Sequence, residues 1–306
     1  MPTVVFFGYG QFGLTGVDVL ASVGARIAAV VTPVNRSGPD VESMTTDANR
    51  REIPVLIQPP RRAIEPFVAH VRALAPDVII VWSYSMILPK SVLEVPRYGA
   101  VNMHGGLLPE FRGGHVGQWA LISGAPEFGI TLHYMDEGID TGPVIAESRF
   151  SVDSDDDAER LREKLRAAGA ALLLKWWPQI ATGTAPRVPQ DSSRAKYWPL
   201  RTAEQGRIDW SMSADAIGRL VRALACNAPG AYIETQNRQV TIRRVHAVAS
   251  DRETVVEPGH IVTANEGAVR VRTGDGDLII SEAEYGKRRL TMAELARCFD
   301  DGAQLS

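Results

Sequence analysis

The stretch TVVFFGYGQFG, residues 3–13, decides the fold of the first part of the chain. Its first five residues are an apolar run rich in β-forming side chains, and Phe12, Val17 and Leu20 then recur at roughly helical spacing. The glycines between the two patterns are typical of a tight turn. The stretch therefore predicts a strand, a turn and a helix in immediate succession.

The same alternation continues along the next part of the chain. Strand-like apolar runs lie at 27–32, 55–58, 78–83 and 100–104, with helical or loop-like segments such as 63–74 between them. This order predicts an α/β fold, a Rossmann-like parallel sheet covered on both faces. An alternating run at 129–135 and a long helix at about 156–182 follow. The acidic cluster Ser154–Asp157 precedes that helix, so we expect it to cap the helix rather than to bind a metal.

Composition changes after Gly183. Residues 184–201 contain three prolines and little periodicity, which is typical of a connection between domains. A helix at about 214–225 and short strands near 231–234, 240–248, 260–263, 268–272 and 278–283 then predict a small OB-like β-barrel. We expect an N-terminal catalytic domain over 1–190, a linker over 191–205 and a C-terminal β-barrel domain over 206–306.

Overall composition excludes several classes of function. The 306 residues include 33 basic and 36 acidic side chains, a formal net charge of −3, so the whole chain has no general attraction to nucleic acid, although a local basic patch stays open. The two cysteines show neither CxxC spacing nor a nearby histidine cluster, which gives no support to a disulfide framework or a metal site. Without a leader or a long apolar run, we expect a cytoplasmic protein with no membrane partner.

Gly8, Gly10 and Gly13 form a GxGxxG match between the predicted strand and helix, as in a dinucleotide-binding turn. That function also needs an acidic residue at the end of the second strand, and residues 32–37 supply none. We therefore favour close packing of helix on strand as the reason for the glycines. An NAD-dependent oxidoreductase stays as the alternative of another enzyme class.

Asn102 and His104 lie two residues apart on a predicted strand, so both side chains emerge on the same face. A glycine-rich loop follows them, which places them at the carboxyl end of a parallel sheet, where open α/β folds bind ligands. An amide donor beside an imidazole suits a tetrahedral intermediate, because one group stabilises an oxyanion while the other carries a proton. The alternative is that both side chains merely satisfy loop backbone groups.

The turn at 135–143 contains Asp136, Glu137 and Asp140, together with two glycines that allow a tight bend. A tight bend aims a carboxylate inward, but a solvated turn or weak cation ligands fit the same pattern. The turn by itself does not choose between them.

Several motifs occur together in this order: Asn102-x-His104, Leu107-Leu108-Pro109, Arg112-Gly113, Gly129-Ile130-Thr131, Met135-Asp136 and Gly138-Ile139-Asp140-Thr141-Gly142-Pro143. Together they resemble the folate-dependent formyltransferase family, whose members formylate methionyl-tRNA, nucleotide sugars or glycinamide ribonucleotide. The resemblance extends through Arg207-Ile208-Asp209-Trp210 and Pro229-Gly230-Ala231-Tyr232, and so covers most of the chain.

The resemblance implies transfer of a formyl group from 10-formyltetrahydrofolate, the co-substrate, to a primary amine. Asn102, His104 and Asp140 match the family's catalytic residues: the first two would stabilise the oxyanion, and Asp140 would orient His104 or accept a proton. Residues 82–89 match the segment that wraps the pterin ring. The implied folate-binding residues are Trp82, Tyr84, Met86, Ile87, Leu88, Leu107, Pro109, Arg112 and Asp136. For Met86, Ile87 and Leu88, packing in the core is the alternative.

The acceptor is predicted from departures from the family pattern. Related tRNA enzymes carry a strongly basic loop after the second strand, whereas residues 33–53 hold three basic and four acidic side chains. Gly106 stands where the family usually has serine, and His115 lies in a stretch that usually includes proline. We therefore expect a small-molecule amine acceptor, such as a nucleotide-activated amino sugar, with methionyl-tRNA as the alternative. A catalytically inactive ligand-binding relative is disfavoured by the three catalytic residues.

Overall fold

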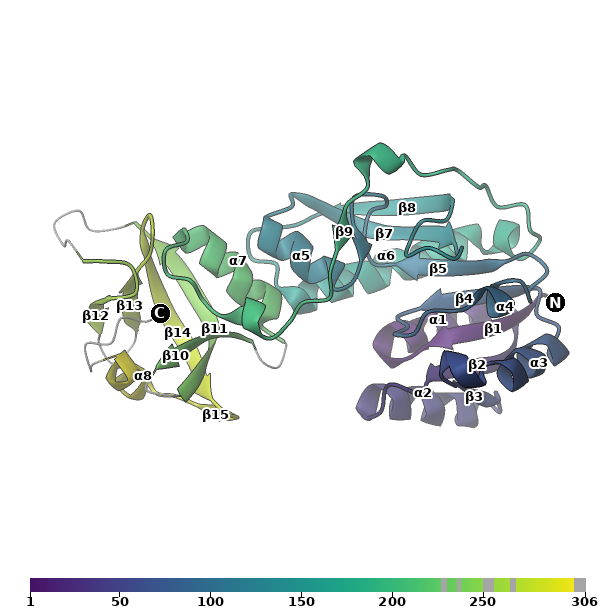
Figure 1. The fold of residues 1–306 in the computed structure, drawn as a ribbon, viewed down its shortest axis with the longest axis horizontal. Helices are drawn as coiled ribbons and strands as arrows, with labels where there is room; N and C mark the ends of the chain where they lie inside the picture. The colour runs from purple at the N-terminus through teal and green to yellow at the C-terminus, as the bar shows by residue number, and fades with distance from the viewer. Residues whose placement is uncertain (227–229, 236–237, 250–255, 265–267, 300–306) are drawn as a thin grey trace. The chain divides into compact units, whose positions relative to one another are not determined.

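A computed structural model describes residues 1–226, 230–235, 238–249, 256–264 and 268–299 (Figure 1). The chain forms two compact units. The first consists of residues 1–113, 128–150 and 163–198, and the second of residues 114–127, 151–162 and 199–306. Two short segments, 114–127 and 151–162, therefore belong to the second unit although the chain before and after each belongs to the first.

A seven-stranded sheet organises the first unit, in the order β3-β2-β1-β4-β5-β7-β8. Its strands are β1 (Thr3–Gly8), β2 (Arg26–Pro33), β3 (Val55–Gln58), β4 (Val78–Trp82), β5 (Ala100–His104), β7 (Glu127–Tyr134) and β8 (Val144–Ser151). The five strands from β3 to β5 are parallel, and β7 runs antiparallel to β5. The predicted α/β class is confirmed, with one antiparallel neighbour at β5.

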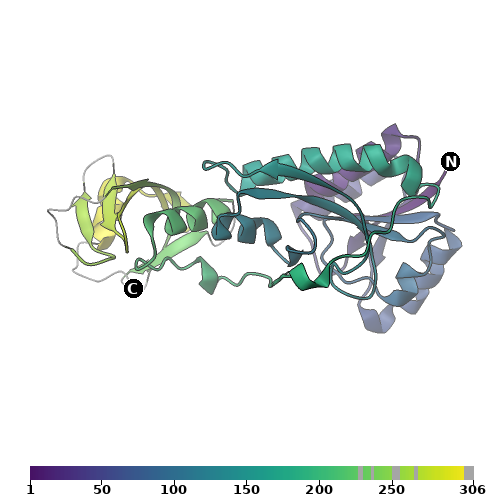
Figure 2. The ribbon, with the colours of Figure 1, turned by 90° about the horizontal axis from the view of Figure 1, so that it is seen from above.

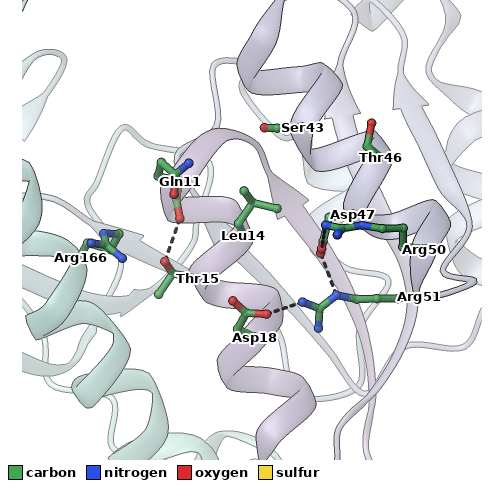
Figure 3. Close-up of a pocket in the computed structure, with 10 residues that line it drawn as sticks. All are labelled: Gln11, Leu14, Thr15, Asp18, Ser43, Thr46, Asp47, Arg50, Arg51 and Arg166. Atoms are coloured by element: carbon green, nitrogen blue, oxygen red, sulfur yellow. Dashed lines mark hydrogen bonds and ion pairs between the residues drawn. The ribbon is translucent and has the colours of Figure 1, made fainter.

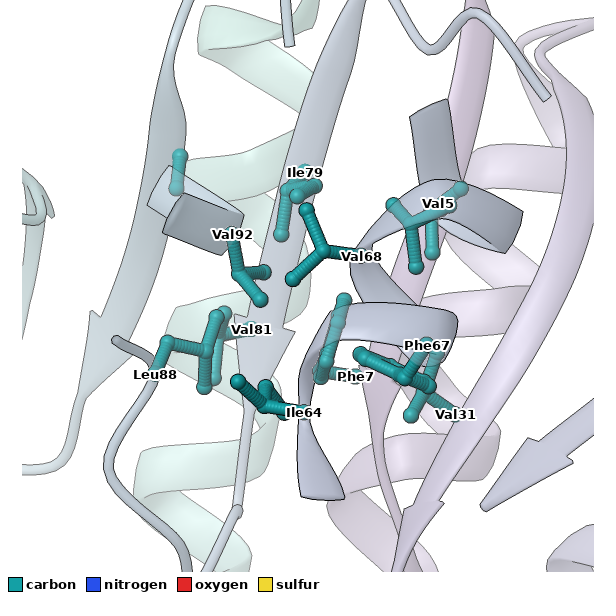
Figure 4. Packing of buried hydrophobic residues seen from close by; sticks show 12 residues of the cluster. Val5, Phe7, Val31, Ile64, Phe67, Val68, Ile79, Val81, Leu88 and Val92 are labelled. Atoms are coloured by element: carbon teal, nitrogen blue, oxygen red, sulfur yellow. The ribbon is translucent and has the colours of Figure 1, made fainter. Parts of the chain in front are cut away.

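Helices cover both faces of this sheet (Figure 2). The helices are α1 (Gly10–Ser22), α2 (Pro39–Arg50), α3 (Glu65–Ala73), α4 (Lys90–Leu93) and α6 (Ala158–Ile180), with the 3-10 turn η1 (Arg61–Ala63) before α3. On one face, Trp82 packs closely against Gly16 of α1 and Gly169 of α6. On the other, Phe67 and Val68 of α3 pack with Phe7 and with the alternate side chains of β1 and β4 (Figure 4). Burial on both faces explains why these strands are continuously apolar.

Segment 33–53 contains a helix where the sequence suggested a loop. Pro39 is in the first turn of α2, together with Asp40 and Glu42. Proline suits the first turn of a helix, and acidic side chains there interact favourably with the helix dipole. The same residues that make the segment acidic thus help α2 to form.

The GxGxxG glycines pack closely, as predicted. A Cβ on Gly8 would lie 2.4 Å from the carbonyl oxygen of Trp82, and one on Gly13 would lie 3.1 Å from the carbonyl carbon of Gly8. The first distance is shorter than van der Waals contact permits, so only glycine fits. At α6, Asp157 accepts hydrogen bonds from the backbone N–H groups of Glu159 and Arg160, which confirms the expected cap.

The predicted linker begins inside the first unit. There β9 (Tyr197–Trp198) pairs in parallel with β6 (Arg112–Gly113), after the 3-10 turn η2 (Ser192–Arg194). The Lys196 N–H donates to the Pro109 carbonyl, and the Arg112 N–H donates to the Lys196 carbonyl. These backbone bonds fasten residues 196–198 to the loop that follows β5.

The second unit combines helices with a six-stranded antiparallel sheet. Its strands are β10 (Ala231–Thr235), β11 (Arg238–Val248), β12 (Ile261–Ala264), β13 (Val269–Arg272), β14 (Asp277–Tyr285) and β15 (Arg288–Arg289). Its helices are α5 (Val116–Ser123), α7 (Ala214–Leu224) and α8 (Met292–Phe299), with the 3-10 turn η3 (Glu204–Gly206). Ser213 caps α7 by accepting from the Ala216 N–H. The sequence predicted a small OB-like β-barrel for this part of the chain, and the antiparallel sheet agrees with that fold class. Among the described helices, none is long and apolar enough to cross a membrane.

Candidate functional site

Polar side chains converge where β5 and β7 pair. Asn102 and His104 belong to β5, and the antiparallel register sets Asn102 opposite His133 of β7 and His104 opposite Thr131. Asn102 Nδ2 lies 3.2 Å from His133 Nε2. Asp140 follows β7 in the turn before β8, with one carboxylate oxygen 3.5 Å from His104 Nδ1 and 3.7 Å from His133 Nε2. The structure thus brings the three predicted catalytic residues together.

His133 is a fourth member of this cluster, and the sequence did not single it out. Its side chain is 2% exposed, and Nδ1 lies 2.8 Å from the Tyr134 carbonyl oxygen. Since a carbonyl only accepts, the Nδ1–H donates, and neutral Nε2 is left to accept from Asn102. Burial, and next the nearby His104, lower the pKa of His133 from 6.5 to about 4. A neutral His133 therefore fixes the orientation of the Asn102 amide.

His104 is equally constrained by its surroundings. It is 7% exposed, and Nε2 donates to the Phe111 carbonyl oxygen at 2.5 Å. In the neutral ring this bond leaves Nδ1, the nitrogen that faces Asp140, without a proton. A Cβ on Gly106 would lie 2.9 Å from both His104 Nε2 and the Phe111 oxygen, so glycine leaves room for this hydrogen bond.

Asp140 has an unusual backbone conformation, with φ of +53°. Such values are uncommon for residues other than glycine and persist only where the surroundings hold them. The Gly113 N–H donates to Asp140 Oδ2 at 2.9 Å. Asp136 stabilises the same turn by accepting from the Gly138 N–H and the Thr141 hydroxyl. These hydrogen bonds therefore hold the turn in a conformation that directs the Asp140 carboxylate towards His104.

The residues expected to bind folate fall into two groups. Trp82 and Leu88 are 2% and 3% exposed and pack in the core, so neither side chain faces a ligand. Tyr84 and Met86 are half-buried, and Ile87 is 75% exposed. The ring of Tyr84 packs edge-on against Phe7, and burial raises the pKa of its hydroxyl. The part of this loop that remains accessible to a ligand is therefore centred on residues 84–87.

Two residues that the sequence did not suggest anchor this loop. Gln58, at the end of β3, donates to the Ile87 carbonyl at 3.2 Å, and Ser85 donates to Asn35 Oδ1 at 2.8 Å. Both anchors come from the carboxyl ends of neighbouring strands, a position that would have marked them as candidates.

The other expected folate residues have structural contacts. Leu107 and Pro109 are buried beside β7, where a Cβ on Gly129 would lie 2.7 Å from Leu107. Arg112 is 4% exposed and is hydrogen-bonded by Gln190 and Tyr197. Asp136 is exposed and stabilises its own turn, as described above.

A separate cavity of about 530 Å³ lies between α1, α2 and α6 (Figure 3). Arg51 contacts both Asp18 and Asp47, and Arg50 also contacts Asp47. Arg166 of α6 adds a third, exposed guanidinium. Most of the charge in this cavity is thus neutralised within it.

The fold and the site define a group-transfer enzyme. An amide donor, two imidazoles and a carboxylate meet at the sheet edge where open α/β folds act on ligands, and together they suit acyl transfer through an oxyanion. Among the described residues, no group of three or more His, Cys, Asp or Glu side chains is placed to hold a metal ion.

Comparison with known proteins identifies the family. Residues 11–176 match the family model described as "Formyl transferase", and residues 201–300 match "Formyl transferase, C-terminal domain". The methionyl-tRNA formyltransferase of Myxococcus xanthus (strain DK1622) is 34% identical over 301 residues, covering 96% of this chain and 94% of that protein. The protein of the same description from Pelobacter propionicus is 35% identical over 310 residues, covering 97% and 93%.

A solved structure agrees with these matches. The N-formyltransferase from Helicobacter canadensis, in complex with folinic acid and dTDP-3-aminofucose, shares the fold with a TM-score of 0.69 at 16% identity, over 92% of this chain and 99% of that one. The chain therefore belongs to the folate-dependent formyl transferase family. It is a formyltransferase, and the formyl donor of this family is 10-formyltetrahydrofolate.

Proposed function

We propose that the acceptor is the amino group of methionyl-tRNA. The observation that carries this proposal is the similarity of the chain, across both domains, to relatives named methionyl-tRNA formyltransferase. The sugar-modifying neighbour shares the fold at much lower identity. This proposal replaces the small amine favoured by the charge of residues 33–53.

Three side chains would perform the transfer. One Asn102 N–H is directed to His133, which leaves the second to stabilise the oxygen of the formyl group as negative charge develops there. His104 Nδ1 would take the proton of the attacking amine, because Nε2–H is held by the Phe111 carbonyl. Asp140, 3.5 Å from Nδ1, would then stabilise the imidazolium. The imidazolium would return this proton to N10 of the donor as the bond between N10 and the formyl carbon breaks and tetrahydrofolate leaves.

The distribution of charge in the structure also supports an RNA acceptor. Arg36, Arg61 and Arg62 are exposed in the loops after β2 and β3, at the same edge of the sheet as the catalytic residues. Among the residues that the structure describes, none forms an ion pair with these three arginines. Free guanidinium groups there suit contacts with phosphates.

The test compares charge reversals at opposite edges of the sheet. Arg61→Glu with Arg62→Glu should raise the KM for methionyl-tRNA roughly tenfold or more and flatten its salt dependence, because phosphate contacts release counterions. Arg26→Glu, at the amino end of β2, is the matched exposed control and should change KM little. Steady-state formylation at several salt concentrations measures both effects.

The same assay includes a nucleotide-activated amino sugar as acceptor. If the wild-type protein formylates the sugar efficiently and leaves methionyl-tRNA unmodified, the acceptor proposal is wrong. The membership of the formyl transferase family would still stand.

A further inference from the structure

We infer that Gln190 is a positioning residue for catalysis, which holds Asp140 in the geometry that the reaction needs. This inference rests on the catalytic role proposed above for Asp140. Gln190 comes from the segment that composition suggested was near the end of the catalytic domain, 50 residues after Asp140.

Every hydrogen-bonding group of the Gln190 side chain is used. Its Nε2 donates to the backbone carbonyls of Asp140, at 2.9 Å, and of Gly142, at 2.7 Å. Its Oε1 accepts from Arg112, at 3.1 Å from Nε and 2.7 Å from Nη2. Two donors and two acceptor sites are all that a glutamine amide offers. An amide whose donors and acceptor sites are all hydrogen-bonded to protein groups has a defined orientation, unlike a side chain that makes a chance contact at the surface.

The arginine partner is itself fixed from the same segment. Arg112 is 4% exposed, its Nη1 donates to the Tyr197 hydroxyl at 3.0 Å, and its guanidinium lies 5.4 Å from the centre of the Tyr197 ring. The pairing of β6 with β9 holds the backbones of Arg112 and Tyr197 in register. The Gln190 amide is therefore paired with a buried arginine that is itself held by a side-chain contact and by backbone pairing.

These contacts close a ring around Asp140. Gln190 fixes the Asp140 carbonyl, Gln190 also binds Arg112, and Gly113, the next residue, donates its N–H to the Asp140 carboxylate. Backbone and side chain of Asp140 are thus held by one connected unit. This unit explains how a residue other than glycine keeps a φ of +53°. Without Gln190, the turn has less to hold it there, and the carboxylate moves away from His104 Nδ1.

Gln190→Glu is the sharpest variant. It keeps the length of the side chain and its bonds to Arg112, but it replaces two N–H donors by a carboxylate that faces two carbonyl oxygens. Gln190→Ala removes the contacts without adding charge, and it carries the test if the glutamate variant fails to fold. Asp191→Ala is the matched control, because Asp191 is exposed and its carboxylate accepts its described hydrogen bonds from Ser193, outside the contacts around Asp140.

We expect Gln190→Glu to lower kcat by about 10- to 100-fold, since small misplacements of a catalytic group cost that much. The KM for 10-formyltetrahydrofolate and the binding of a folate analogue should change less than about threefold, because the accessible pterin-loop residues 84–87 lie outside this ring of contacts and Gln190→Glu keeps the bonds to Arg112. Asp191→Ala should keep the wild-type kcat. Circular dichroism and thermal unfolding verify that each variant is folded.

A double-mutant cycle separates positioning from general stability. In an Asp140→Asn background, Gln190→Glu should lower the single-turnover rate less than about twofold, because the group that it positions is already lost. An equal loss in both backgrounds, or a wild-type kcat for both Gln190 variants, would overturn the inference. The cycle is run with whichever amine the wild-type protein formylates. If the wild-type protein does not formylate methionyl-tRNA, the acceptor proposal fails, and the role of Gln190 is still tested with the other amine.

Discussion

Two polar regions of the first unit differ in how they use their charges. The cluster of Asn102, His104, His133 and Asp140 is largely buried, and its members meet where β5 pairs with β7 and at the turn that follows β7. The cavity between α1, α2 and α6 is open, and two of its three arginines, Arg50 and Arg51, are bound to Asp18 and Asp47. The first region keeps reactive atoms, such as His104 Nδ1, without a strong partner, while the second leaves few charges uncompensated.

This difference distinguishes a catalytic site from an ordinary charged surface. Burying polar groups costs free energy unless each is paired, so a buried cluster with directed but incomplete pairing is kept for its chemistry. Exposed ion pairs cost little and contribute little. The presence of a cavity is therefore a poor guide in this protein, because the cavity between α1, α2 and α6 is not where the catalytic groups converge.

The largest expected effect is on turnover. His104→Ala and Asp140→Asn should each lower kcat by about two orders of magnitude or more, as is usual for proton-transfer and charge-stabilising groups. Arg166→Ala, in the cavity, should remain within about twofold of the wild-type protein. Formylation kinetics on folded variants measure all three. If the cavity variant lost as much as the buried ones, the contrast between the two regions would be false.

A second effect concerns stability at acidic pH. The pKa of His133 is about 4 in the folded protein and 6.5 as the ordinary value, so the unfolded chain binds more protons between these pH values. Stability from the neutral ring is complete above pH 6.5 and falls as pH drops towards 4, by about 2–3 kcal/mol.

Replacing His133 by a side chain that does not titrate tests whether this residue causes the loss of stability at acidic pH. Urea unfolding of the wild-type protein and of His133→Met, between pH 7 and pH 4, measures the difference. The variant should lose less stability over that window than the wild-type protein. Parallel pH profiles for the two proteins would show that His133 does not stay neutral.

The smallest expected effect lies in the cavity. Asp47→Asn keeps the shape of the side chain but removes the charge shared by Arg50 and Arg51, and it should reduce the free energy of unfolding by about 1 kcal/mol without changing kcat. The loss should shrink in high salt. A fall in kcat in this variant would mean that the cavity communicates with the catalytic cluster.

Most of the sheet was predictable because its strands are buried on both faces. The bounds expected for β3 and β5 agree with the structure. In the structure β1 is one residue longer than expected at its end, and β2 is one residue longer at both ends. Segment 33–53 was not predicted as a helix, because α2 has few apolar residues and depends on its first-turn proline and acidic side chains. Periodicity alone carries no signal for such a helix.

The catalytic residues were predictable where they share a strand or a motif, and not where pairing brings them together. Asn102 and His104 are two residues apart, whereas His133 meets Asn102 only because β7 runs antiparallel to β5. A single histidine inside the apolar run at 129–135 was the available signal. Gln190 had none, since residues 184–201 have the composition of a connection. Its role depends on contacts with residues 48 to 78 positions away.

The pairing of β9 with β6 limits how this protein can be cut and recombined. An experimenter who shortened the chain at Gly183, where composition changes, would discard Gln190 and the strand that holds Arg112. We expect such a fragment to keep its sheet but to lose the ordered turn around Asp140. A hybrid that exchanges C-terminal modules between relatives should therefore be joined after Trp198, so that the catalytic half brings its own fastening strand with it.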